Sequence, residues 1–123
     1  MCLFCELKNH KDKLIYENDL VFAIEDEFPV SKGHLLLITK RHIETYFETT
    51  KEEVLALDEA MKRLKIQLDQ KYKPQGYNIG INNGINAGQS ILHLHLHLIP
   101  RYFGDVLNPR GGVRSVIPGK QDY

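Results

Sequence analysis

Three histidines alternate with leucines near the carboxyl end of the chain. His93, His95 and His97 lie between Leu92 and Leu98 in the run Leu-His-Leu-His-Leu-His-Leu. A period of two is the period of a β-strand, so an extended chain would present the imidazoles on one face, about 6.6 Å apart, and the leucines on the other. Imidazoles titrate near neutral pH and offer both a donor and an acceptor. The pattern predicts a chemical site on one face and core leucines on the other.

Two kinds of chemistry suit such a histidine row. A His-x-His pair on a strand can hold one zinc ion, as in metal-dependent hydrolases. Alternatively, the middle imidazole can attack an electrophile such as phosphorus while its neighbours orient it or move protons. A catalytic zinc site usually needs a further ligand and a general base, and no acidic residue lies within or immediately beside the row. Nucleophilic catalysis is therefore favoured, and zinc-dependent hydrolysis stays open as the alternative.

A loop rich in glycine and asparagine precedes the row. Gly84 and Gly88 allow a close approach of the backbone and expose its amides. Asn82, Gln89 and Ser90 add side-chain donors. Such groups suit an anion without requiring net positive charge. Its position directly before three histidines predicts that the loop binds phosphate.

Composition limits the classes of function. A chain of 123 residues with 42% hydrophobic content suffices for one domain with a core. Sixteen basic and sixteen acidic residues cancel, so the basic field typical of nucleic-acid-binding proteins is missing. No stretch approaches the ~20 apolar residues of a membrane span. We expect a cytoplasmic protein with neither nucleic acid nor membrane as a partner.

Short apolar runs predict the strands that must position the row. Residues 14–16 and 20–24, joined by Glu17-Asn18-Asp19, predict a β-hairpin. Residues 34–39 predict a strand buried on both faces, and residues 77–82 predict a further strand by their alternation.

One long amphipathic helix is predicted between these strands. Thr50 and Glu53 have the spacing of a capping box, and the helix should end near Tyr72, before Pro74. Apolar residues then recur at helical spacing, at Val54, Leu57, Met61, Leu64 and Leu68. Residues 43–47 predict a short helical turn. Together the elements predict an α+β domain with a mostly antiparallel sheet.

The two cysteines form a Cys-x-x-Cys pair. Cys2 and Cys5 are the only cysteines of the chain. In a reducing compartment such a pair suits a metal half-site or a redox motif better than a structural disulfide. The spacing alone does not distinguish metal binding from redox chemistry or free thiols.

The row and its surroundings resemble the histidine triad (HIT) family. Residues 93–99 match its His-φ-His-φ-His-φ-φ signature, and Gly88-Gln89-Ser90 matches as well. The match extends through Asn82 and His34 to the Cys2 to Cys5 segment. The resemblance implies a HIT-like fold, with a mostly antiparallel five-stranded sheet, one long helix and one short helix. It implies a single domain over residues 1–123, usually dimeric, with a tail at about 101–123 that packs on the domain or on a dimer partner.

The resemblance also implies a covalent mechanism that cleaves nucleotidyl bonds. His95 is similar to the family's nucleophile for the α-phosphorus, His97 to its partner at the phosphate, and His34 to a fourth histidine that orients or polarises the group. The implied nucleotide contacts are Asp26 for the ribose hydroxyls, Asn82, Gln89 and Ser90 for the phosphate and leaving group, and Leu3, Phe4 and Ile24 for the purine.

The expected substrate is a purine nucleotide conjugate, such as a phosphoramidate, an adenylyl conjugate or a dinucleoside polyphosphate. Pro100-Arg101-Tyr102 and the tail resemble the bacterial branch often labelled diadenosine tetraphosphate hydrolase-like. Arg101, Arg110 and Arg114 are candidates for contacts to additional phosphates, or else are surface charges. A nucleotide-binding or scaffolding module with incidental catalysis is the alternative from another class.

Family members that carry the cysteine pair resemble proteins with structural zinc. The implied ligands are Cys2, Cys5, His42 and His93, a closed Cys2His2 set. In the alternative, the cysteines are unliganded and His42 is an exposed residue at the end of a strand. With zinc, the row divides into a catalytic pair and one structural ligand.

Overall fold

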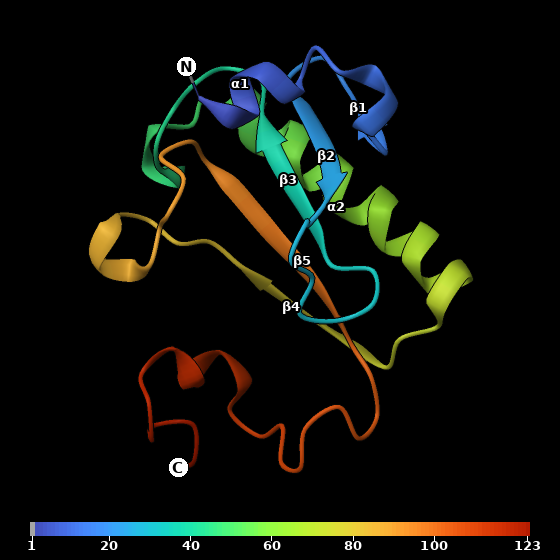
Figure 1. The fold of residues 1–123 in the computed structure, drawn as a ribbon, viewed down its shortest axis with the longest axis vertical. Coiled ribbons are helices and arrows are strands. Elements are labelled where there is room, and N and C mark those ends of the chain that lie inside the picture. Colours follow the sequence, from blue (N-terminus) through green and yellow to red (C-terminus); the bar gives the residue numbers. More distant parts are fainter. Residues whose placement is uncertain (1) are drawn as a thin grey trace.

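The fold is one five-stranded antiparallel sheet with a long helix on one face and a short helix on the other (Figure 1). The computed structural model describes residues 2–123. The strand order is β1-β2-β3-β5-β4. The strands are β1 (Tyr16–Glu17), β2 (Val21–Glu25), β3 (Leu35–Thr39), β4 (Gly76–Gly80) and β5 (His95–Arg101), and the helices are α1 (Leu3–Leu7) and α2 (Lys51–Tyr72). The predicted α+β class and mostly antiparallel sheet are confirmed.

Asn18 forms the turn of the predicted hairpin between β1 and β2. Its Oδ1 accepts hydrogen bonds from the backbone N–H groups of Leu20 and Val21, at 3.0 and 2.9 Å. Its Nδ2 donates to the carbonyl of Ala56 in α2, at 3.1 Å. One side chain therefore closes the turn and attaches it to the helix.

Helix α2 begins at the predicted capping box. Thr50 Oγ1 accepts from the backbone N–H of Glu53, and Glu53 Oε1 accepts from the backbone N–H of Thr50. The helix ends at Tyr72, as predicted, and is followed by the C-cap residue Lys73, which has a left-handed φ of 52°. Its apolar stripe packs on the sheet through Leu57, Ala60, Leu64 and Leu68.

The two faces of the sheet have different coverings. The face under α2 carries buried aliphatic residues, among them Val21, Leu37 and Leu96. The opposite face carries Phe22, Ile24, Leu36 and Ile38 together with Phe4 of α1. Strand β3 is buried on both faces, as predicted. On this second face the pairing places Leu36 opposite His97 and Ile38 opposite His95.

The histidine strand starts later than its sequence predicts. Strand β5 begins at His95, and the preceding segment leaves the sheet, where the N–H of Leu94 donates to the carbonyl of Ile43 at 2.7 Å. Leu94 is buried as predicted, but Leu92 is 44% exposed, so its assignment to the core was wrong. A 3₁₀ turn, η2 (Tyr46–Glu48), overlaps the helical turn expected at 43–47. Helix α1 was not predicted as a helix.

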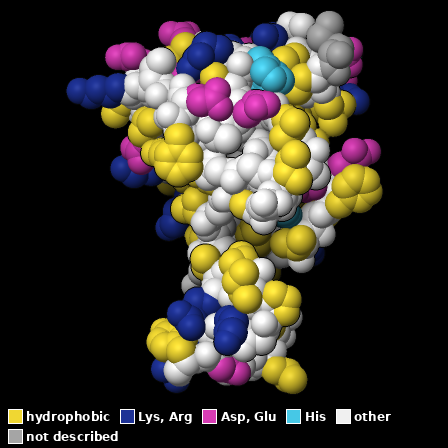
Figure 2. Space-filling model, turned by 90° about the vertical axis from the view of Figure 1, so that its left-hand side faces the viewer, with side chains coloured by type: hydrophobic (Ala, Val, Ile, Leu, Met, Phe, Trp, Pro, Cys, Tyr) yellow, Lys and Arg dark blue, Asp and Glu magenta, His cyan; other side chains and the backbone are white. Residues whose placement is uncertain are grey.

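The chain after β5 forms a separate lobe. Residues 102–123 lie below the sheet in Figure 1 and are joined to it by a narrow neck in Figure 2. The lobe contains the 3₁₀ helix η4 (Gly112–Val116), which lies against β4, with Gly112 beside the Asn78 amide. Over residues 2–123 no helix is long and apolar enough to cross a membrane.

Candidate active site and metal-ligand cluster

His95 is held by a backbone carbonyl at the start of β5. Its Nδ1 lies 2.8 Å from the carbonyl oxygen of His93. A carbonyl can only accept, so Nδ1 carries the proton and the neutral ring keeps its lone pair on Nε2. Within residues 2–123, Nε2 has no hydrogen-bond partner. The sequence-predicted nucleophile thus has its free nitrogen in the nucleophilic form.

His34, His97 and Asp26 come together beside it, on the same face of the sheet. The backbone N–H of Val30 donates to His34 Nδ1 at 3.1 Å, so neutral His34 carries its proton on Nε2. That Nε2 lies 2.9 Å from His97 Nδ1 and 3.3 Å from Asp26 Oδ2. When His97 accepts at Nδ1, its own proton lies on Nε2. The ring centroids of His95 and His97 are 5.4 Å apart, so a ring able to donate a proton lies next to the predicted nucleophile.

Burial keeps these two rings neutral. Desolvation lowers the pKa of His34, although the Asp26 carboxylate acts in the opposite direction. Desolvation also lowers the pKa of His97, and the neighbouring rings of His95 and His34 lower it further. At neutral pH, His97 can therefore donate from Nε2 without being an imidazolium.

The Asp26, His34 and His97 atoms are close enough to surround a cation, but their hydrogen bonds favour proton transfer. A metal would have to bind His34 at Nε2, and the bond from Val30 places the proton on that nitrogen. The zinc-hydrolase alternative also needs two neighbouring histidines of the row on one ion. The free Nδ1 of His93 faces the Cys2 thiol, whereas the free Nε2 of His95 has no partner within residues 2–123, so the geometry does not favour one ion shared by these two rings.

Cys2, Cys5, His42 and His93 form the second cluster, as the resemblance implied. Their ligand atoms all lie within 4.8 Å of one another. His93 Nδ1 is 3.3 Å from Cys2 Sγ and 3.6 Å from Cys5 Sγ, and His42 Nδ1 is 3.2 Å from Cys5 Sγ. His93 Nε2 donates to the carbonyl of Thr39 at 2.7 Å, so its lone pair on Nδ1 faces the thiols. Two thiols and two imidazoles at these separations fit structural zinc.

Phe4 connects the two clusters. It lies on α1 between the cysteines and is 2% exposed. Its ring is edge-on to His93 and His95, at centroid distances of 5.8 and 5.1 Å. Of the three predicted purine contacts, Leu3 is on the surface, whereas Phe4 and Ile24 are buried in the cluster that covers this face of the sheet.

Gln89 positions the glycine-rich loop. It was predicted to contact phosphate, but it is 4% exposed and both ends of its amide are used within the chain. Oε1 accepts from the N–H of Gly84 at 2.8 Å, and Nε2 donates to the carbonyl of Glu44 at 2.6 Å. Asn82 is half-buried and Ser90 is exposed, so both keep accessible side chains.

Asn83 was missed by sequence reasoning. Its Oδ1 accepts from the backbone N–H of Tyr46 at 2.8 Å and fastens the glycine-rich loop to η2. No signal in the sequence distinguishes it from Asn82 next to it.

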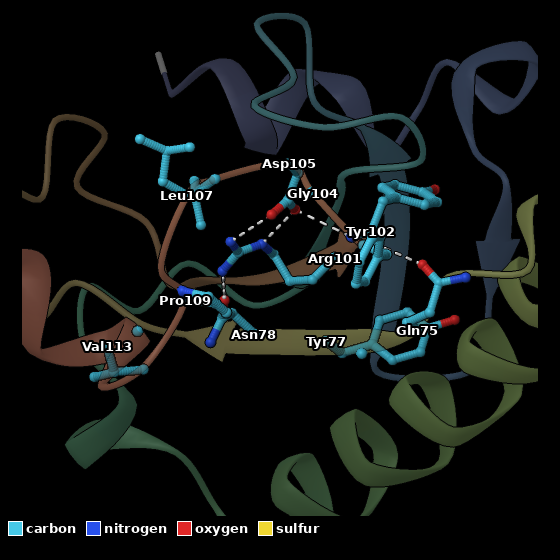
Figure 3. Close-up of a pocket in the computed structure, with 14 residues that line it drawn as sticks. Gln75, Tyr77, Asn78, Arg101, Tyr102, Gly104, Asp105, Leu107, Pro109 and Val113 are labelled. Atoms are coloured by element: carbon cyan, nitrogen blue, oxygen red, sulfur yellow. Dashed lines mark hydrogen bonds and ion pairs between the residues drawn. The ribbon is translucent and has the colours of Figure 1, made fainter.

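The three arginines considered for additional phosphates are already engaged. Arg101 donates through Nε and Nη2 to both oxygens of Asp105, at 2.8 and 2.9 Å, and through Nη1 to Asn78 Oδ1 at 2.6 Å (Figure 3). This pairing lowers the pKa of Asp105 to about 2. The guanidinium groups of Arg110 and Arg114 lie over the ring of Tyr123, at 4.6 and 4.7 Å.

The antiparallel sheet carries a cluster of histidines beside a glycine-rich loop. These features define the class of this protein: an α+β domain whose candidate active site is built from histidines. The sequence profile described as the HIT domain matches residues 8–104. The chain therefore belongs to the HIT domain family.

Solved structures and a curated relative agree. A HIT family protein from Bacillus subtilis is 37% identical, with a TM-score of 0.78 over 85% of this chain and 75% of that chain. A zinc-bound histidine triad family protein from Mycobacterium smegmatis is 33% identical, with a TM-score of 0.78 over 87% of this chain and 79% of that chain. The adenylylsulfatase HINT3 of Arabidopsis thaliana is 34% identical over 108 residues, which cover 86% of this chain and 55% of the relative.

Proposed function

We propose that this protein is a nucleotidyl hydrolase or transferase that forms a covalent nucleotidyl-histidine at His95. One observation carries the proposal: the carbonyl of His93 holds the proton of His95 on Nδ1 and leaves Nε2 as the nucleophile. Membership of a nucleotide-binding family and a relative named an adenylylsulfatase support it.

The reaction then has two balanced steps. His95 Nε2 attacks the α-phosphorus, and the bond from phosphorus to the leaving atom breaks with its electron pair on that atom. His97 Nε2 supplies the proton that the leaving atom needs, through the ring that His34 orients. Water then attacks phosphorus and gives its proton to His97, and the P–Nε2 bond breaks and returns its electron pair to His95. In a transferase, another hydroxyl replaces water.

The residues proposed to contact the nucleotide lie around these histidines. Asp26 is next to His34 and His97 and carries a carboxylate suited to the ribose hydroxyls. Asn82 and Ser90 are the accessible donors for the phosphate, whereas Gln89 maintains the loop. Leu3 is 51% exposed and offers apolar surface to a purine, whereas Phe4 and Ile24 belong to the buried cluster of this face.

The Cys2His2 cluster is proposed to hold structural zinc through Cys2, Cys5, His42 and His93. The zinc-bound relative from Mycobacterium smegmatis supports this assignment. Bound zinc would supply a cross-link between α1, the loop after β3 and the histidine row. Proton and nucleophile chemistry stay with His95, His97 and His34.

We further propose a homodimer in the cytoplasm. Among residues 2–123, strand β4 has a hydrogen-bonded neighbouring strand only on its β5 side, and Ile79 on it is 51% exposed. Open strand edges with apolar side chains are the surfaces that proteins cover. A second copy paired edge to edge would cover β4. The cytoplasmic location is supported by composition.

The test uses an adenosine 5′-phosphoramidate and a dinucleoside tetraphosphate with wild-type protein, His95→Asn and His10→Asn. His10 is an exposed histidine away from the site and serves as the matched control. We expect His95→Asn to lower kcat by at least about 10³-fold while AMP still binds, and His10→Asn to behave as wild type. Negligible turnover in all three proteins with intact AMP binding would indicate a nucleotide-binding module instead.

A further inference from the structure

A second cavity continues the catalytic face beyond His97. It has a volume of about 310 Å³ and lies between the loop before His34, strands β4 and β5, and the tail lobe. Its lining includes Val30, Ser31, Asn78, Ile99, Ser115 and Gln121. The larger cavity of about 480 Å³ shares part of this lining and extends toward the Gly76 end of β4. The catalytic histidines line neither cavity, and the smaller one is the cavity that includes Ile99 of the histidine strand.

The sheet places the second cavity next to the proton donor. Side chains alternate along β5, so His97 and Ile99 share a face and are about 6.6 Å apart. On the neighbouring strand, Gly80 pairs with His97 and Asn78 with Ile99. A Cβ added at Gly80 would meet no atom within 4 Å, so the space beside His97 is open toward the cavity.

The polar groups of the cavity do not suit an anion. Arg101 is the only cation in its lining, and it is neutralised by Asp105 in a two-bond pair. Ser31 Oγ and Ser115 Oγ each donate to a carbonyl and keep lone pairs for accepting.

The two amides of the cavity complete this set. Gln121 donates through Nε2 to two carbonyls, so its Oε1 is free to accept within residues 2–123. Asn78 uses only Oδ1 within the same residues and keeps Nδ2 as a donor. A set of several acceptors, one amide donor and no unpaired cation selects a neutral group that carries its own N–H or O–H donors.

We propose that this cavity binds the leaving group, and that the preferred leaving group is a neutral amine or alcohol bearing amide or hydroxyl donors rather than a chain of phosphates. The inference rests on the proposed function, because it is His97 that would protonate the leaving atom at the mouth of the cavity. It assigns the tail lobe a part in substrate selection, through Ser115 and Gln121.

The experiment compares two adenosine 5′-phosphoramidates that differ in one group. One carries an N-(4-carbamoylbutyl) chain and the other an N-(4-carboxybutyl) chain of the same length, and the unsubstituted phosphoramidate is the reference. We expect kcat/KM to be about tenfold higher for the amide than for the carboxylate, because the carboxylate offers no donors to the acceptors of the cavity.

A matched pair of tail variants tests the location. Ser115→Phe fills the cavity, whereas Val116→Phe adds the same ring to the next residue of η4, which is 74% exposed and outside the lining. Ser115→Phe should reduce the kcat/KM ratio of the amide to the unsubstituted substrate by about tenfold, and Val116→Phe should leave the ratio as in wild type. The same comparison of dissociation constants in a His95→Asn background reports on the cavity without turnover.

The outcomes separate the two proposals. Equal use of amide and carboxylate, or equal effects of the two tail variants, would overturn the leaving-group cavity and leave the nucleophile in place. Absence of His95-dependent turnover of the unsubstituted phosphoramidate, with Ser115→Phe still weakening binding of the amide conjugate, would overturn the catalytic proposal and support the cavity.

Discussion

Backbone groups, rather than neighbouring side chains, assign the protons of the histidines. The carbonyls of His93 and Thr39 accept from His95 Nδ1 and His93 Nε2, and the amide of Val30 donates to His34 Nδ1. The backbone group that each ring meets therefore decides which of its nitrogens is free, and this difference suits the separate roles proposed for these histidines. Histidines that look equivalent in the sequence therefore differ in the fold in which ring nitrogen carries the proton.

A pH dependence follows at this scale. The pKa values of His34 and His97 lie below the ordinary 6.5, chiefly because the rings are desolvated. Below pH 6.5 these histidines bind protons in the unfolded chain but not in the folded protein. The free energy of unfolding should therefore be at its full value above pH 6.5. It should fall as the pH decreases from 6.5 toward the lowered pKa values. Urea unfolding across about pH 5 to 8 measures this slope.

His97→Asn removes one of the two rings and should make that slope shallower, whereas His10→Asn should keep it. A slope unchanged by His97→Asn would show that another group causes the loss of stability.

The chemistry of the site could be predicted residue by residue where one short segment carries it. The alternation at 92–98 singled out His93, His95 and His97, and the resemblance assigned their expected roles and added His34 and the expected metal ligands. The partners of the Gln89 side chain within the chain, Gly84 N–H and Glu44 O, could not be predicted, because Glu44 is 45 residues away in the sequence. A contact to a backbone group cannot be predicted from residue types, because every residue carries the same backbone carbonyl.

At the scale of elements, helix α1 is the part that we expect to depend most on the proposed metal. It is five residues long, too short to be stable by itself, and its neighbours are the two cysteines and Phe4. His42 lies on the loop after β3, and Arg41 beside it pairs with the buried Glu53 of α2 at 2.8 Å. A metal bound by the four ligands would therefore join α1 to the capped end of α2.

Zinc should accordingly be present at about one ion per chain, and chelation should lower Tm by at least about 5 °C because the metal binds only the folded protein. Elemental analysis and thermal unfolding measure the two quantities. Cys5→Ser should lose the zinc and the response to chelator, and His10→Asn should keep both. Purified wild-type protein that is folded and free of zinc would refute the metal site, and chelation that abolishes turnover without lowering Tm would favour a zinc hydrolase.

The elements themselves were largely predictable, because period and capping are local signals. The capping box located the start of α2, and Asn18 located the hairpin turn. The first residue of β5 was not predictable, since the alternation continues through His93 while the backbone turns away to bond Ile43. Helix α1 was missed because its sequence shows a Cys-x-x-Cys pattern and little helical periodicity.

At the scale of the whole molecule, the edge strands of the sheet have backbone groups available for pairing with another chain. Strand β4 is the longer open edge, since β1 at the other edge has only two residues. The apolar stripe of α2 faces the sheet and is not available for a partner. Dimerisation is thus expected through β4.

Light scattering during size exclusion should give twice the chain mass of 14.2 kDa. Ile79→Lys should shift the protein toward the monomer, because it places a charge on the covered edge, and Ile66→Lys on the exposed side of α2 should not. A monomer mass for the wild type at micromolar concentration, or dissociation by both variants alike, would contradict the edge-to-edge dimer.

The different hydrogen bonds of the four site histidines have a spectroscopic consequence. Neutral His34, His93 and His97 carry the ring proton on Nε2, and His95 carries it on Nδ1. In a nitrogen-15 spectrum of these four imidazoles, three rings should show a protonated Nε2 and an unprotonated Nδ1. His95, the proposed nucleophile, should show the opposite pattern, with a protonated Nδ1 and an unprotonated Nε2. Its signal could then be followed through the reaction, since nucleotidylation would occur at the nitrogen that lacks a proton.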